Sequence, residues 1–320
     1  MASLKNSIPA GDRVEAVDVA ENMLLVVTSK LGGNLWNGSL KVIDLATGEV
    51  VASLQQRCGC ADASWASLGQ RAICAEDSGD VKVYRLDTDT PKQFVEIMTL
   101  QQHDDIVSSV AVNPAQDGLV LSGSFDRSVN LWDITGASDA PLNTFTGHNG
   151  SVTGVEFANG EDGVHNFATS SLDSGLRLWD RRQSQVCAIH RLGSPALSLS
   201  WEAASQALIA VGCQNGSLSI LDKRALAAPV SLIQEAHVGR VNATSFSPAS
   251  FRGGEGYPLL ASAGDDGVVT IRRVEQEGQP NRSALHSDYV QALAWSDVNT
   301  LITGGWDSQI CLLEIGQVTT

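Results

Sequence analysis

One stretch of the chain, residues 103–134, is the clearest copy of a unit that recurs along nearly the whole sequence. Residues 106–112 and 129–132 within it are rich in β-branched and apolar side chains, which favour strands. Pairs of residues drawn from Asn, Asp, Gly and Pro separate these runs and are typical of turns. The unit closes on Leu131-Trp132-Asp133. A chain assembled from such copies is predicted to be all-β.

The closing motif, an alternating apolar run that ends at the position of Trp132 and Asp133, occurs seven times. Its tryptophan position falls at residues 43, 84, 132, 179, 221, 272 and 313. Successive copies are thus 41 to 51 residues apart, and only Trp132 and Trp179 retain the tryptophan. This spacing resembles that of the WD40 repeat, whose unit is one four-stranded blade of a β-propeller. The resemblance implies a seven-bladed WD40 β-propeller.

The two ends of the chain indicate how such a ring closes. Too few residues follow the seventh copy to form an outermost strand, and an open blade would leave an unpaired sheet edge. We therefore expect residues 3–8 to supply the outer strand of the last blade and residues 13–20 the innermost strand of the first. The prediction is one domain over residues 1–320, with blades at about 13–57, 58–103, 104–148, 149–194, 195–239, 240–288, and 289–315 together with 3–8.

The composition restricts the class of partner. Hydrophobic residues make up 43% of the chain and charged residues 18%, which predicts a folded core. The net charge of −15 disfavours nucleic acid and anionic membranes as partners, because both require a basic surface, and it favours Arg-rich or Lys-rich tails. The sequence contains neither a long apolar run nor a signal-peptide pattern, so we expect a soluble intracellular protein.

No residue pattern predicts a metal or a cofactor. The sequence has no Gly-rich phosphate loop and no metal-ligand spacing. Asp104-Asp105 and Asp265-Asp266 occur in turn contexts, where solvated charges are expected. The six cysteines include no C-x-x-C pair and are interpreted as buried free thiols: Cys58, Cys60, Cys74, Cys187, Cys213 and Cys311.

Three repeats carry a histidine, a hydroxyl residue and an aspartate at matching positions. They are His103, Ser122 and Asp126; His148, Thr169 and Asp173; and His286, Thr303 and Asp307. Such trios suggest a hydrolase, but a catalytic triad is needed once and in a cleft. In WD40 proteins, which the repeats resemble, these positions and the tryptophan, here Trp132 or Trp179, form a buried hydrogen-bond network. The expected role is structural, and blades in which the pattern is lost, at Ser78, Asn215 and Arg272, should be held mainly by packing.

Several large apolar residues fall in predicted loops on one face of the ring. Trp36, with Leu35, lies in a Gly-rich insertion of the first blade, whereas Tyr289 and Trp306 lie in loops of the last. Because these blades adjoin at the closure, we expect the three aromatic residues to gather at one seam and to anchor a protein partner. The alternative is that Tyr289 and Trp306 pack on their own blade. Matching positions in other blades extend this apolar surface, at Phe125 and Leu172, and three tryptophans are expected in the core, Trp65, Trp201 and Trp295.

Four motifs together resemble the methylosome WD-repeat subunit, the methylosome protein 50 family. They are residues 35–40 (LWNGSL), 76–79 (EDSG), 102–108 (QHDDIVS) and 305–307 (GWD). The resemblance implies a non-catalytic scaffold that binds the amino-terminal barrel of the type II protein arginine methyltransferase. It further implies that Trp36 and Tyr289 contact that enzyme, that Arg-rich substrates such as Sm proteins and histones are partners, and that the protein is cytoplasmic and nuclear.

A second binding function remains open at this stage. Trp179-Asp180-Arg181-Arg182 matches the W-D-x-R pattern of WD40 proteins that act as substrate receptors of a cullin ubiquitin ligase. An enzyme, a hydrolase built on a propeller, is the third alternative, and the repetition of the trios disfavours it.

Overall fold

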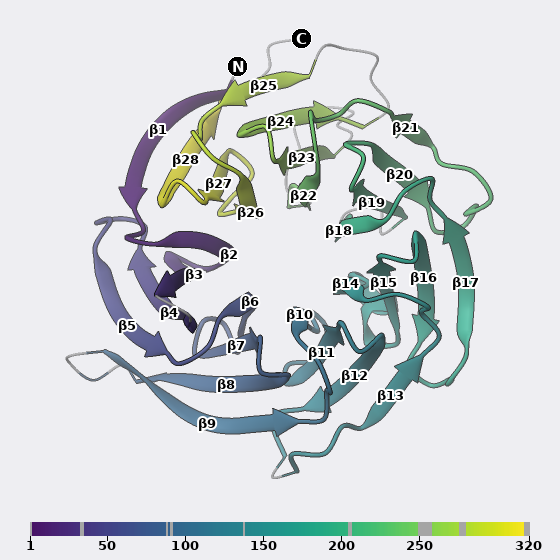
Figure 1. Ribbon diagram of the computed structural model, residues 1–320, viewed down its shortest axis with the longest axis horizontal. Coiled ribbons are helices and arrows are strands. Elements are labelled where there is room, and N and C mark those ends of the chain that lie inside the picture. Colours follow the sequence, from purple (N-terminus) through teal and green to yellow (C-terminus); the bar gives the residue numbers. More distant parts are fainter. Residues whose placement is uncertain are drawn as a thin grey trace.

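The computed structural model describes residues 2–32, 35–87, 89, 92–136, 138–203, 207–248, 258–274 and 280–316. Its strands form seven four-stranded antiparallel sheets. Figure 1 shows these sheets as the blades of a ring around a central opening, with the first strand of each sheet innermost. The predicted all-β, seven-bladed propeller is therefore confirmed.

Each blade runs outward through consecutive strands, except the last, which takes its outer strand from the amino terminus. The first three blades are β2 (Arg13–Ala20), β3 (Met23–Gly32), β4 (Leu35–Asp44) and β5 (Val50–Gln56); β6 (Cys60–Ala66), β7 (Arg71–Glu76), β8 (Asp80–Asp87) and β9 (Gln93–Gln101); and β10 (Val107–Val112), β11 (Leu119–Ser124), β12 (Ser128–Asp133) and β13 (Asn143–Thr146). The fourth blade is β14 (Val152–Phe157), β15 (Asn166–Ser171), β16 (Gly175–Asp180) and β17 (Val186–Arg191), with the 3-10 helix η1 (Gly160–Val164) between β14 and β15. The last three blades are β18 (Ala196–Trp201), β19 (Leu208–Cys213), β20 (Leu218–Asp222) and β21 (Ser231–Ile233); β22 (Val241–Phe246), β23 (Leu259–Gly264), β24 (Val268–Arg273) and β25 (Asn281–Ala284); and β26 (Val290–Trp295), β27 (Thr300–Gly305), β28 (Gln309–Ile315) and β1 (Ala2–Pro9).

The amino-terminal strand closes the ring in the predicted way. β1 pairs antiparallel with β28, from Ala2 opposite Ile315 to Pro9 opposite Gln309. Figure 1 shows β1 on the outside of the seventh blade, beside β28. This pairing covers the edge of β28 that would otherwise expose unpaired backbone groups.

The hydrophobic core lies between neighbouring blades, where the faces of two sheets meet. Phe145 of the third blade packs edge-on against Phe167 and Trp179 of the fourth, with ring centroids 4.8 and 5.6 Å apart. Burying side chains of this size stabilises the fold by about 2–3 kcal/mol each. Trp65 and Trp201 are buried as predicted, and Trp295 is partly buried against the core cluster of the last two blades.

Neighbouring innermost strands are joined through side chains rather than through a backbone ladder. Each such side chain accepts a hydrogen bond from a backbone N–H of the next blade, which satisfies a donor that no sheet pairing reaches. The pairs are Asp18 with Trp65 (2.7 Å), Asp62 with Val110 (3.0 Å), Ser109 with Val155 (3.3 Å), Glu156 with Trp201 (3.0 Å) and Ser200 with Phe246 (3.1 Å). The channel wall is thus built from short polar side chains and carboxylates.

Candidate partner-binding face

The first predicted trio forms a closed hydrogen-bond network inside the third blade. His103 Nδ1 donates to Asp126 Oδ2 over 2.8 Å, so Nε2 accepts from the hydroxyl of Ser122, also at 2.8 Å. Trp132 Nε1 donates to the same hydroxyl oxygen over 2.8 Å. Hydrogen bonds from His103 and Ser128 hold the pKa of Asp126 well below its ordinary value, despite the desolvation that opposes them.

The same arrangement recurs in the fourth and seventh blades. Nε2 of the histidine lies 2.7 Å from the threonine hydroxyl in both, His148 with Thr169 and His286 with Thr303. Asp173 and Asp307 accept hydrogen bonds from the two histidines, and Trp179 Nε1 donates to Thr169 over 2.9 Å. None of these residues lines either of the two described cavities of the channel. The trios thus lie inside three blades, away from these two cavities.

A fourth trio, in the sixth blade, was not predicted from the sequence. His237 Nδ1 lies 3.0 Å from Asp266 Oδ1, and Nε2 lies 2.9 Å from Ser262 Oγ. The expectation that Asp266 is a solvated turn charge was thus wrong, since its side chain is only 10% exposed and lies in this network. In all four trios the aspartate follows the hydroxyl residue by four positions, a spacing that could have identified it. Arg272, which replaces the tryptophan, obscured the match.

The second blade replaces the network with a buried ion pair. Lys82 Nζ lies 3.2 Å from Glu76 Oε1, and the Glu76 side chain is 2% exposed. This ion pair adds to the packing that was expected to be the main support of the blade. Burial raises the pKa of Tyr84, which occupies the tryptophan position. Among the cysteines, Cys187 is exposed and Cys58 is half-buried, so the expected burial was wrong for both and holds for the other four.

The turns between the second and third strands of the blades lie beside the loops that lead into the innermost strands. Both sets lie on one face of the ring, which we call the turn face. In six blades the first residue of the turn between the second and third strands donates a backbone hydrogen bond to the carbonyl of the residue just before the innermost strand. The pairs are Asp77 with Gly59 (3.0 Å), Phe125 with Ile106 (2.9 Å), Leu172 with Ser151 (2.9 Å), Gln214 with Pro195 (2.9 Å), Asp265 with Arg240 (3.1 Å) and Trp306 with Tyr289 (2.8 Å). These bonds fix the loops of the turn face to the rigid blades.

Apolar side chains project from these fixed loops. Phe125, Leu172 and Tyr289 are 37%, 39% and 40% exposed, and Val238 is 80% exposed. Tyr289 also contacts Trp306, with ring centroids 5.4 Å apart, so the two aromatic rings form one surface. Rigidly held apolar side chains on loops are typical anchors for a protein partner.

Trp306 is the best-anchored aromatic residue of the turn face. Its Nε1 donates to Glu15 Oε2 over 3.2 Å, and the guanidinium of Arg13 lies over its ring at 4.9 Å. The side chain of Ser29 donates a second hydrogen bond to Glu15. Burial raises the pKa of Glu15, and the two hydrogen bonds partly oppose this shift. Trp306 therefore connects the seventh blade to the first.

Trp36, the third aromatic residue of the predicted seam, packs against the neighbouring second blade. Gly59 of the second blade lies so close beneath the Trp36 indole and the Asp77 carboxylate that a Cβ at this position would overlap both. Trp36 is 36% exposed and sits where the first blade meets the second. The side chain of Leu35 lies outside the described residues.

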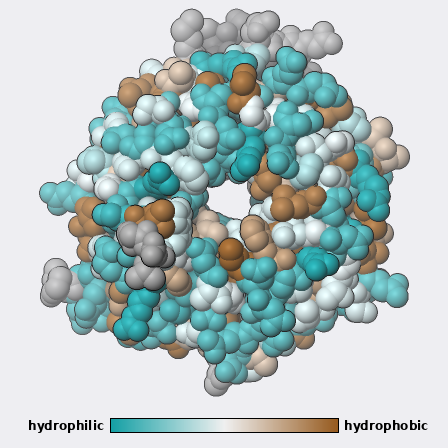
Figure 2. All heavy atoms as spheres, viewed as in Figure 1, coloured by the Kyte–Doolittle hydropathy of each residue, from teal (hydrophilic) through white to brown (hydrophobic). Residues whose placement is uncertain are grey.

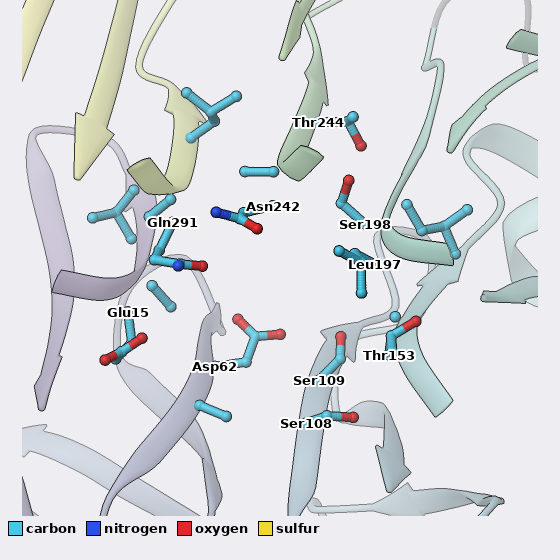
Figure 3. A pocket seen from close by; sticks show the side chains of 18 of the residues that line it. Glu15, Asp62, Ser108, Ser109, Thr153, Leu197, Ser198, Asn242, Thr244 and Gln291 are labelled. Atoms are coloured by element: carbon cyan, nitrogen blue, oxygen red, sulfur yellow. The ribbon is translucent and has the colours of Figure 1, made fainter. Parts of the chain in front are cut away.

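The central channel opens onto the turn face through a ring of β-bulges. Every innermost strand has a bulge near its start, after the second residue in β2 and after the first in the other six. The seven bulged residues are Glu15, Ala61, Ser108, Thr153, Leu197, Asn242 and Gln291. All seven line one cavity of about 370 Å³, shown in Figure 3. In Figure 2 the channel is visible as an opening at the centre of the ring, with hydrophilic and hydrophobic residues both at its rim.

The part of the chain that the structure describes contains neither a metal-binding cluster nor a membrane-spanning helix. There, no three or more His, Cys, Asp or Glu side chains are grouped so that they could hold a metal ion. Within the same residues, no helix has the length and apolar character needed to cross a membrane.

Comparison with known proteins assigns the repeats. Residues 94–133, 139–180 and 279–313 match the family described as WD domain, G-beta repeat. The seven-bladed ring therefore carries WD40 repeats over these three segments. WD40 propellers are typically non-catalytic, and their functions reside in surfaces rather than in the fold itself.

The curated relatives carry names from ribosome assembly. The chain is 23% identical to the ribosome biogenesis protein WDR12 homolog of Oryza sativa subsp. japonica, over 95% of this chain and 74% of the relative. It is 26% identical to the protein of the same name in Chlamydomonas reinhardtii, over 97% and 78% of the two chains. The homolog in Anopheles gambiae is 24% identical, over 93% of this chain and 59% of its own length.

These relatives overturn the functions expected from short motifs. The methylosome resemblance, and with it the arginine methyltransferase, Sm proteins and histones as partners, conflicts with relatives named for ribosome biogenesis. Trp36, the residue assigned to methyltransferase contact, packs over Gly59 of its own ring. The cullin-receptor alternative is wrong on the same comparison. Arg182 of the W-D-x-R pattern pairs with Asp180 at 2.5 Å, as Arg224 does with Asp222, so this motif is a recurring feature of the blades.

Proposed function

We propose that this chain is a non-catalytic scaffold in ribosome biogenesis and that its turn face binds a protein component of a pre-ribosomal particle. The names of the relatives support the process, and their names describe no enzyme. The observation that carries the choice of surface is the set of exposed apolar side chains held on backbone-fixed loops, Phe125, Leu172 and Tyr289. A nuclear location accompanies this function.

A protein partner is favoured over RNA because of charge. The net charge of −15 repels phosphate backbones, whereas specific binding to RNA draws much of its affinity from basic side chains. Exposed acidic residues also lie on the turn face, among them Asp104 and Asp105. The partner segment is therefore expected to be basic and partly apolar.

The test is sedimentation of tagged protein with pre-ribosomal particles. A variant with Phe125→Ser, Leu172→Ser and Tyr289→Ser should leave the particle fractions, because hot-spot residues of this kind typically contribute 1–2 kcal/mol or more each. The matched control carries three equally exposed substitutions on the outer strands, Val50→Ser, Ile189→Ser and Leu232→Ser. Equal loss in both variants, or retention in the first, contradicts the proposal.

A further inference from the structure

The channel mouth is lined by carboxylates, with no basic side chain among the described residues of its wall. The cavity ringed by the seven bulges is lined by the carboxylates of Glu15 and Asp62, and no Lys, Arg or His is among the described residues that line it. A second cavity of about 350 Å³ continues from the first, shares Asp62, and adds Asp18 and Glu156, again without a basic side chain among the described residues. Carboxylates that are partly buried without a basic neighbour are stabilised either by protonation or by a bound cation.

The carboxylate of Asp62 retains room for a ligand. Its Oδ1 accepts a hydrogen bond from the N–H of Ala63 (2.9 Å), Oδ2 accepts one from the N–H of Val110 (3.0 Å), and the hydroxyl of Ser109 donates a third to this carboxylate. A carboxylate has about four lone-pair sites, so further donors can still be accepted. Because Asp62 belongs to both cavities, it lies at the junction between the mouth and the deeper channel. Burial raises the pKa of Asp62 to about 7, which is consistent with a missing counter-charge.

A buried hydroxyl at the same cavity also lacks a partner. Thr244 is 9% exposed and lines the mouth, as Figure 3 shows, yet its Oγ1 has no hydrogen-bond partner among the described residues. An unpaired buried hydroxyl costs about 1–3 kcal/mol, so such groups usually face a polar ligand or water. Figure 3 places Thr244 across the cavity from Glu15 and Asp62. Thr244 thus adds an unsatisfied hydroxyl to the wall opposite the two carboxylates.

The surface beside the mouth already accommodates a guanidinium. Glu15 accepts a hydrogen bond from Trp306, and Arg13 lies over the Trp306 ring at 4.9 Å. Tyr289 extends this aromatic surface outward on the turn face. A peptide that crosses Tyr289 and Trp306 would thus pass directly over the channel mouth.

We infer that the channel mouth is a socket for the cationic side chain, arginine or lysine, of the partner segment that crosses the turn face. The side chain enters through the ring of bulges, and its charged group binds the carboxylates of Glu15 and Asp62. The inference rests on the proposed function for the identity of the partner, but the socket itself is a property of the isolated ring.

The experiment is a titration of the purified full chain with the blocked pentapeptide Gly-Gly-Arg-Gly-Gly and its lysine and glutamine analogues, at low ionic strength. The arginine and lysine peptides should bind and the glutamine peptide should not. Affinity should fall by about tenfold from pH 8 to pH 6, since protonation near pH 7 removes the charge of Asp62. Equal binding of all three peptides, or of none, overturns the inference.

The variant Asp62→Asn should bind the arginine peptide at least fivefold more weakly, and its affinity should lose most of its dependence on pH. Asp44→Asn is the matched control, because Asp44 also accepts two backbone N–H groups but lies at the end of β4, away from the cavity residues. If Asp62→Asn does not fold, Glu15→Gln must show the fivefold loss. Unchanged binding in the folded variant refutes the socket.

The two proposals fail separately. Loss of peptide binding with intact sedimentation would remove only the socket. Intact peptide binding in a ring that never sediments with pre-ribosomal particles would remove only the proposed function.

Discussion

Trp306 Nε1 donates a hydrogen bond to Glu15 Oε2 over 3.2 Å, and this contact joins the last blade to the first on the turn face. On the outside of the ring, the same junction is closed by the pairing of β1 with β28. The closure is therefore secured twice, at its inner and outer edges. Glu15 has two roles on the turn face, because it anchors Trp306 and also lines the channel mouth.

Replacement of Trp306 by phenylalanine should lower the free energy of unfolding by about 1 kcal/mol, because Glu15 loses a hydrogen bond while most of the apolar contact remains. Chemical denaturation of the isolated ring measures the change. Tyr289→Phe, which keeps the ring contact with Trp306, is the control and should be nearly neutral. Equal stability of Trp306→Phe and the unmodified protein would show that the closure does not depend on this bond.

Asp126→Ala should destabilise the fold by about 2–3 kcal/mol, because a buried histidine loses the acceptor that fixes its tautomer. The exposed residue Asp139 provides a control, Asp139→Ala, which changes the net charge equally. Thermal or chemical unfolding measures both. A stable Asp126→Ala variant would indicate that the four trios do not brace their blades.

Arg272→Trp should stabilise the sixth blade by about 1 kcal/mol. Trp132 and Trp179 donate to Ser122 and Thr169, and an indole at position 272 could donate to the equivalent Ser262. It would also remove a buried guanidinium whose Nε has no hydrogen-bond partner among the described residues. The neighbouring substitution Arg273→Trp is the control. Lower stability of Arg272→Trp would show that the arginine has a role that the network cannot replace.

The stability of the ring should decline between pH 5 and pH 8. Burial raises the pKa of Asp62 to about 7 and that of Glu156 to about 8, from ordinary values near 4. A raised carboxyl pKa contributes stability that is fully present below about pH 4 and is lost as the pH rises through the folded value. Asp173 acts in the opposite direction, because its pKa of about 2 contributes stability that is lost only as the pH falls below about 4.

Urea denaturation at several pH values measures this decline. Glu156→Gln should flatten the slope between pH 5 and pH 8, whereas the exposed substitution Glu49→Gln should not. A ring that becomes more stable from pH 5 to pH 8 would contradict the assignment of raised pKa values to the channel carboxylates.

The sequence was sufficient for features that repeat. Seven alternating motifs at regular spacing predicted seven blades, and the shortage of residues after the last motif predicted the outer position of β1. The three complete trios were recognisable because each preserves residue type and spacing. These features depend on local periodicity and on the need to pair every sheet edge, and both can be judged from the chain alone.

Features that depend on distant contacts were not predictable. Trp36 packs over Gly59 of the next blade, a contact that leaves no signal in the sequence. The bulges that bring seven residues to one cavity leave no pattern in the sequence. The bulged residues differ in size and charge, from the small Ala61 to the acidic Glu15. Short motifs also misassigned the function, since Arg182 and its aspartate belong to the architecture of the blade.

Hydrogen exchange of the backbone amides, compared between the free ring and the ring bound to pre-ribosomal particles, tests the central claim most directly. The account predicts slower exchange on binding at the loops of the turn face, residues 103–107, 150–152 and 286–290, with no change in the outer strands β13, β17 and β21. Protection confined to those outer strands, with the turn face unchanged, would contradict it.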